Sequence, residues 1–133
     1  MDSFEMTCQF PVNSEKIYSA WLSSEMHSSF TDSLAAIQEE IESKFTALDG
    51  FVTGHIMELE KNERIMQSWR TEDFHMDDDD SIVVLEFHNN PEGCKMHLKH
   101  WNIPEGLSAK YMTLWSDRYC QPMLSYFNKE TNS

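Results

Sequence analysis

This 133-residue chain has little of several features that would point to a particular class of protein. It has only four glycines, scattered along the sequence, so no glycine-rich loop is available to hold a nucleotide phosphate. It has no apolar run long enough to form a transmembrane helix. Its first residues do not combine a basic segment with an apolar stretch, so we read no signal peptide and predict a cytoplasmic protein.

Positive charge is also scarce. The chain has 10 Lys and Arg against 23 Asp and Glu, which gives a formal net charge of −13. Such a surface repels the phosphates of nucleic acids and the head groups of anionic lipids. We therefore expect neither a nucleic acid nor a membrane as a partner.

Cysteine is present but without a recognisable pattern. Cys8, Cys94 and Cys120 are odd in number, far apart and without CxxC spacing. This argues against a disulfide framework and against a cysteine metal site. We predict that the three side chains act as small buried hydrophobes.

Motifs for metal binding and nucleophilic catalysis are missing. His97 and His100 are three residues apart, which on a strand puts them on opposite faces and prevents them from sharing an ion. The acidic run Asp77–Asp80 lacks the spaced ligands and the glycine of a calcium loop, so we interpret it as a solvated loop. No GxSxG string is present. The sequence predicts no metal, no cofactor and no catalytic residue.

What remains is the composition of one globular domain, 40% hydrophobic and 12% aromatic, spanning residues 1–133. Alternation of apolar residues predicts a strand over Phe4–Phe10, ended by Pro11, and helical spacing predicts a helix over Ser14–Glu25. Residues 30–43 fit either a helix or a short strand. Further strands, joined by short turns such as Asp49-Gly50, are predicted at Lys44–Leu48, Phe51–Glu60, Arg64–Thr71, Ser81–His88 and Cys94–Trp101.

One long amphipathic helix is predicted over Ser108–Phe127, with a kink at Pro122 and a frayed polar tail at residues 128–133. Its length of about 30 Å would let it lie across the whole antiparallel sheet. A twisted sheet that curls around one helix leaves a space where the two diverge. The predicted fold class is therefore α+β, with a candidate pocket between sheet and helix.

Large aromatic side chains are the most informative feature, and they are Trp21, Phe30, Phe45, Trp69, Trp101, Tyr111, Trp115 and Phe127. They either fill the core or line a pocket for an apolar ligand. Strand alternation turns Gln67 inward with Trp69, and His100 inward with Leu98. These two polar groups must pair with each other, with Tyr111, with water or with a ligand. The predicted ligand-binding residues are Trp21, Phe30, Phe45, Gln67, Trp69, His100, Tyr111 and Trp115.

On the opposite face of the sheet, Arg64 and Arg70 lie beside Glu58 and Glu60 of the neighbouring strand. We interpret these as cross-strand ion pairs, which a partner protein could also contact.

Several strings together resemble a known family. They are Phe10-Pro11-Val12, Ile17 to Leu22, Lys44-Phe45-Thr46, Asp49-Gly50-Phe51, Gly54 with Met57 to Glu60, Arg64 to Arg70, His100 with Ile103-Pro104-Glu105, and Trp115, Tyr119, Pro122-Met123 and Tyr126-Phe127. In this order they are similar to stand-alone proteins related to the C-terminal domain of activators of the heat-shock protein 90 ATPase. That family belongs to the START-like, or SRPBCC, superfamily.

The resemblance implies a helix-grip fold, in which a curved antiparallel sheet wraps around a long C-terminal helix and encloses a cavity. The family usually carries Gly-Gly where this chain has Glu42-Ser43, so the local geometry there is in question. Fold alone does not fix function. Three hypotheses follow: a non-enzymatic domain that binds a small hydrophobic ligand, a co-chaperone-like protein that binds a heat-shock protein 90 homologue and stimulates its ATPase, and a polyketide cyclase or hydrolase-like enzyme that would use His100.

Overall fold

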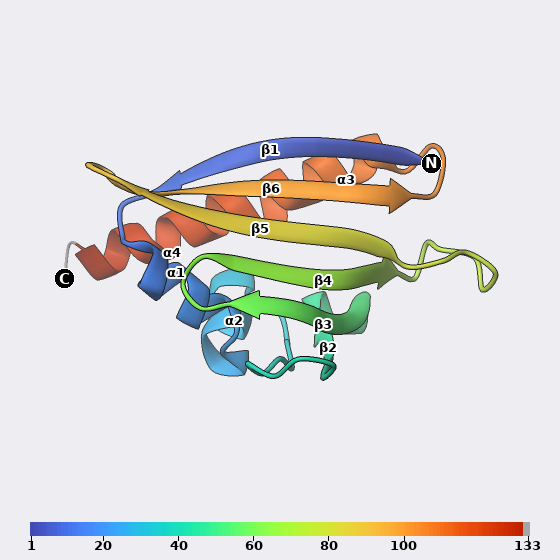
Figure 1. Ribbon diagram of the computed structural model, residues 1–133, viewed down its shortest axis with the longest axis horizontal. Helices are drawn as coiled ribbons and strands as arrows, with labels where there is room; N and C mark the ends of the chain where they lie inside the picture. The colour runs from blue at the N-terminus through green and yellow to red at the C-terminus, as the bar shows by residue number, and fades with distance from the viewer. Residues whose placement is uncertain (132–133) are drawn as a thin grey trace.

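The computed structural model describes residues 1–131 and places six antiparallel strands in one sheet. In space the strands follow the order β1-β6-β5-β4-β3-β2, so β1 and β2 form the two edges (Figure 1). The strands are β1 Asp2–Phe10, β2 Lys44–Ala47, β3 Val52–Glu60, β4 Arg64–Thr71, β5 Ser81–Asn90 and β6 Gly93–Ile103. The predicted strands are confirmed. Each of the strands β2 to β5 pairs antiparallel with the next one in the chain, and short connections join all of these pairs except β4 and β5, which the loop of residues 72–80 joins.

The helical segment after β1 differs from the prediction. It forms two helices, α1 Ser14–Trp21 and α2 Ser24–Thr31, where the sequence predicted one helix to Glu25. The break has a local cause: the Ser23 side chain accepts a hydrogen bond from the Met26 N–H and caps a new helix. Residues 30–43, whose sequence fits either a helix or a short strand, contain the end of α2 and a loop. Ala36 of this loop forms an isolated bridge with Thr46.

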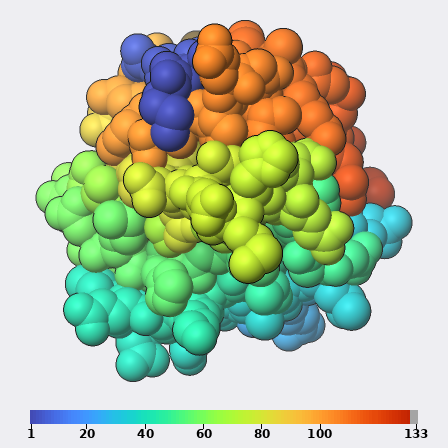
Figure 2. Space-filling model, turned by 90° about the vertical axis from the view of Figure 1, so that its right-hand side faces the viewer, coloured from blue at the N-terminus to red at the C-terminus, as the bar shows by residue number. Residues whose placement is uncertain are grey.

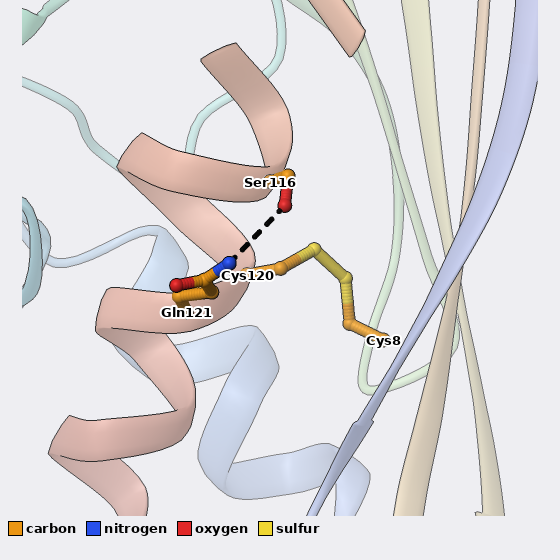
Figure 3. Close-up of a disulfide and its surroundings, with 4 residues drawn as sticks. All are labelled: Cys8, Ser116, Cys120 and Gln121. Atoms are coloured by element: carbon orange, nitrogen blue, oxygen red, sulfur yellow. Dashed lines mark hydrogen bonds between the residues drawn. A yellow bond between two sulfur atoms is a disulfide. The ribbon is translucent and has the colours of Figure 1, made fainter. Parts of the chain in front are cut away.

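The C-terminal helix is long but not uniform. It runs as α3 Ser108–Leu114, a π-helical turn Trp115–Cys120 and α4 Gln121–Thr131. The irregular turn lies directly before Pro122, whose missing N–H interrupts α-helical hydrogen bonding. The Gln121 amide, at the start of α4, donates to Ser116 Oγ of this turn at 3.5 Å (Figure 3). The helix continues to Thr131, beyond its predicted end at Phe127. The rest of the predicted frayed tail, residues 132–133, lies outside the described residues.

The described helices all lie on one side of the sheet, and the C-terminal helix crosses behind β1, β6 and β5 (Figure 1). The buried core fills the layer between them, and the other side of the sheet is left without a helix. This is the predicted α+β helix-grip arrangement. Within residues 1–131, no helix has the length and apolar character needed to cross a bilayer.

The backbone at Glu42-Ser43, where the family resemblance implies two glycines, adopts a conformation that favours glycine. Glu42 has φ 72°, a left-handed conformation that costs an L residue roughly 1 kcal/mol. The turn is held by two backbone hydrogen bonds to β3, from Glu42 N to Ile56 O at 2.7 Å and from Ile56 N to Ser43 O at 2.9 Å. The chain therefore keeps this turn without glycine.

The cysteine prediction is wrong for two of the three residues. Cys8 of β1 and Cys120 at the end of the π-helical turn form a disulfide that ties the edge strand to the C-terminal helix (Figure 3). Their sequence separation of 112 residues hides this pairing from any local pattern. Cys94 is free and buried, as predicted. Disulfides persist mainly in oxidising compartments, so the cytoplasmic location stays a prediction, and in a reducing cytosol this bond would open.

Reduction of this disulfide should lower the free energy of unfolding by about 2–5 kcal/mol, because it releases a long loop in the unfolded chain. Urea unfolding with and without a dithiol reductant measures the difference. The double variant Cys8→Ser/Cys120→Ser is the control, since reductant should leave its unfolding midpoint unchanged. An unchanged midpoint in the wild-type chain would show that the bond is absent or carries no stability.

Candidate functional site

The candidate site is a layer of aromatic side chains between the C-terminal helix and the inner face of the sheet. Trp115 lies at its centre and is fully buried. Its ring centroid is 5.9 Å from Trp21 of α1, 5.9 Å from Trp69 of β4 and 4.7 Å from Tyr119 in the next turn. Trp69 in turn lies 5.0 Å from Tyr111. The π-helical turn places Trp115 and Tyr119, four residues apart, on the side of the helix that faces the sheet.

A first chain of hydrogen bonds runs from this helix into the sheet through His100. Trp115 Nε1 donates to His100 Nδ1 at 3.2 Å, and His100 Nε2 lies 2.8 Å from Ser81 Oγ. Because an indole N–H can only donate, Nδ1 is the bare nitrogen of a neutral imidazole and Nε2 carries the proton. His100 therefore donates to Ser81, whose hydroxyl donates to the Trp69 carbonyl.

A second chain joins the helix to the sheet through His27 of α2. His27 Nδ1 lies 2.8 Å from the Trp21 carbonyl, which can only accept, so Nδ1 carries the proton. His27 Nε2 then accepts from the Tyr119 hydroxyl at 3.0 Å. The Trp21 indole donates to Gln67 Oε1 of β4 at 2.9 Å. Each donor in the two chains has one acceptor, and both histidines are neutral.

Burial fixes these protonation states. Desolvation lowers the pKa of His100 to about 3. It also lowers the pKa of His27 to about 4, against a smaller opposite effect of the hydrogen bond to Trp21. Burial raises the pKa of Tyr119 above its ordinary value and that of Tyr111 to about 12. These four groups are therefore neutral at neutral pH, and none of them titrates near pH 7 in the folded protein.

The lowered histidine pKa values predict a loss of stability in acid. Below the ordinary pKa of 6.5 the unfolded chain binds protons at His27 and His100 that the folded chain refuses, until pH reaches about 4 and about 3. This contribution to stability should be nearly complete above about pH 7 and should fall by about 2 kcal/mol for each histidine between about pH 7 and about pH 5.

Urea unfolding at a series of pH values measures this fall, and NMR of the histidine rings gives an independent reading. Two ring signals should stay at their neutral positions in the folded protein down to about pH 5. A stability that is level between these pH values, or six histidine rings that all titrate near 6.5, would contradict the closed network.

The eight predicted ligand-binding residues are all buried, and the predicted inward faces of β4 and β6 are confirmed. The structure brings seven of them into one aromatic cluster, and these are Trp21, Phe30, Gln67, Trp69, His100, Tyr111 and Trp115. Phe45 lies in the same core on β2, against Gly54 of β3. Trp101, counted among the core rings from composition alone, is on the outer face of β6 and is 37% exposed.

Sequence reasoning missed three polar partners in this layer, which are His27, Ser81 and Tyr119. Tyr119 could have been found, since it follows Trp115 by four residues and shares its helix face. His27 and Ser81 carry no such signal, because a lone histidine and a serine at the start of a strand are ordinary in any sequence. Their role depends on contacts with residues 92 and 19 positions away.

The enzyme hypothesis needed His100 as a base, and the geometry gives it a different role. With its proton on Nε2, His100 is a donor to Ser81 and cannot remove a proton from that hydroxyl. Both side chains are buried, and both His100 nitrogens and the Ser81 hydroxyl are hydrogen-bonded to protein groups. The Ser81–His100 pair therefore connects strands and does not form a nucleophile.

One end of the aromatic layer is covered by the loop of residues 72–80. Phe74 packs on Tyr111 with ring centroids 6.1 Å apart, and Thr71 Oγ1 lies 2.6 Å from the Tyr111 hydroxyl. Arg70 holds the loop through Asp80 at 2.7 Å and through the backbone carbonyls of residues 75 and 78. In Figure 2 this yellow-green segment lies across the end of the molecule, between β1 and the teal β2–β3 region.

This loop changes two predictions about charge. Arg70 pairs with Asp80 of the acidic run instead of with the predicted Glu58 and Glu60. The acidic run is therefore not simply solvated. The predicted cross-strand pairing holds for Arg64, which lies 3.4 Å from Glu58 and 3.9 Å from Glu60.

Comparison with known proteins agrees with this architecture. Residues 11–127 match the family described as Activator of Hsp90 ATPase homolog 1-like protein. The chain is 26% identical over 117 residues to the mouse protein named Activator of 90 kDa heat shock protein ATPase homolog 2. The matched region makes up 88% of this chain and 35% of the mouse protein. The chain thus spans about a third of the length of that relative.

Two solved structures extend the comparison. A crystal structure of an HSP90 activator from Plasmodium falciparum is 25% identical, with a TM-score of 0.81 over 90% of this chain and 91% of that one. A protein from Mesorhizobium loti is 12% identical, with a TM-score of 0.80 over 96% of this chain and 98% of that one, and shows the shared fold alone. The family match over most of its length and its helix-grip fold show that this chain belongs to the Activator of Hsp90 ATPase homolog 1-like protein family, within the START-like superfamily.

Proposed function

We propose that this chain binds a chaperone of the heat-shock protein 90 type and stimulates its ATP hydrolysis. The observation that carries the proposal is the likeness to the Plasmodium falciparum HSP90 activator, which extends over nine-tenths of both chains at 25% identity. The mouse relative, named as an activator of the same kind of ATPase, supports it.

The interior of the domain favours this function over a pocket function. The space between sheet and helix holds side chains in ring contact, and both of its hydrogen-bond chains end on protein groups. A ligand that entered would have to displace these contacts. Binding a partner protein through the outer surface would leave these interior contacts in place.

The proposal predicts that the chain raises the steady-state ATP turnover of a purified heat-shock protein 90 homologue several-fold when present in excess. The physical reason is that a protein which binds the chaperone's active conformation more tightly shifts its population toward that conformation. A coupled ATPase assay measures the rate, and an inhibitor of the chaperone's ATP site defines the background. Binding without a change in turnover would reduce the proposal to a docking role, and no binding would remove it.

The second candidate is the predicted non-enzymatic binding of a small apolar ligand. It is favoured by the convergence of seven predicted residues in one layer, whose end at Tyr111 is covered by Phe74 of the 72–80 loop. Titration with indole should then shift the NMR signals of Trp69, His100 and Trp115 as the loop yields. Signals that stay in place would leave these residues as core alone.

A further inference from the structure

One segment of the surface combines exposed apolar side chains with negative charge. It is the stretch of residues 32–44, which runs from the end of α2 into β2, along the edge of the sheet opposite β1 (Figure 1). Two of its large apolar side chains are exposed, Leu34 by 75% and Ile41 by 53%. A hollow of about 250 Å³ is lined by Ser24, Ala36, Ile37, Gln38 and Lys44. Exposed apolar groups rimmed by polar ones mark surfaces that bind proteins.

The neighbouring elements hold the segment in a fixed shape. Ala36 and Thr46 of β2 exchange two backbone hydrogen bonds, at 3.0 Å and 2.9 Å. On the other side, Ser24 Oγ of α2 accepts from the Ile37 N–H at 2.9 Å and donates to the Ile37 carbonyl at 2.8 Å. A partner that binds here does not have to order the segment first, and this lowers the entropic cost of association.

Carboxylates lie on both sides of the exposed apolar side chains in the sequence. Residues 32–44 contain four exposed carboxylates, which are Asp32, Glu39, Glu40 and Glu42. The same residues contain one ammonium group, that of Lys44, and Arg118 lies beside them with its guanidinium 2.8 Å from Ser33 Oγ. None of the ion pairs among the described residues includes one of the four carboxylates. The segment therefore keeps an excess of negative charge.

The acidic loop of residues 72–80 differs from this segment in how its charge is used. It also has an exposed apolar side chain, Met76, which is 98% exposed. Three of its carboxylates, however, already have partners within the chain, which are Lys110, Arg70 and the His75 N–H. These contacts hold the loop in place, whereas the carboxylates of residues 32–44 have no cation to hold.

We propose that residues 32–44 form a docking surface for a basic segment of a protein partner. Cationic side chains of that segment meet the four carboxylates, and its apolar side chains cover Leu34 and Ile41. The inference rests on the proposed function, in which the partner is the heat-shock protein 90-type chaperone. A second copy of this chain, a nucleic acid and an anionic membrane are all negatively charged, so a chain of net charge −13 repels them. A basic segment is attracted, because opposite charges steer encounter.

The first test removes one exposed apolar side chain at a time. Leu34→Ala should weaken binding of the full-length chaperone by about tenfold, because the leucine side chain becomes buried in the complex. Met76→Ala on the 72–80 loop is the matched control, and it should leave the dissociation constant within about twofold. Calorimetry measures the dissociation constant, and thermal unfolding checks that each variant is folded.

The second test removes two exposed carboxylates at a time. The double variants Glu40→Gln/Glu42→Gln and Asp77→Asn/Asp79→Asn change the net charge equally, and all four side chains are exposed. The first should weaken binding several-fold at low salt and less at high salt, because salt screens exposed charges. The second should have a much smaller effect.

The outcomes separate this inference from the proposed function. If the wild-type chain binds the chaperone but the two members of either comparison have equal effects, the docking surface is wrong and the chaperone proposal stands. Tighter binding by Glu40→Gln/Glu42→Gln leads to the same conclusion. Failure of the wild-type chain to bind the chaperone overturns both. Selective loss in Leu34→Ala and in Glu40→Gln/Glu42→Gln supports both.

Discussion

The structure depends on the way its C-terminal helix is held to the sheet. Two chains of hydrogen bonds cross the aromatic layer, one through His100 and one through His27, and each donor meets one acceptor. In a buried site an unmatched polar group costs about 1–3 kcal/mol, so a closed set of partners fixes the positions of all its members. The Cys8–Cys120 disulfide attaches the same helix to the edge strand covalently.

This closed interior determines where function can lie. The superfamily fold is compatible with ligand binding, catalysis and protein binding, and the same sheet and helix serve each. Here the buried His27 and His100 are neutral and hydrogen-bonded, and the aromatic rings pack on one another.

Much of the fold could be predicted from the sequence because it rests on local patterns. Alternation placed the strands and turned Gln67 and His100 inward, and Pro122 indicated an irregular helix. The same alternation, applied one residue further, turns Trp101 outward, although counting aromatic rings puts it in the core. What could not be predicted are contacts between distant segments. Examples are the disulfide and the pairing of His27 with Tyr119, which depend on how two elements meet in space.

The most direct test of the closed interior is hydrogen exchange of the indole N–H groups, followed by NMR. The account predicts that Trp21 and Trp115 exchange only through global unfolding, so that urea accelerates their exchange in parallel with the loss of stability. The exposed Trp101 should exchange much faster. Exchange of Trp21 and Trp115 at the rate of Trp101 under native conditions would show an interior open to water and would contradict the account.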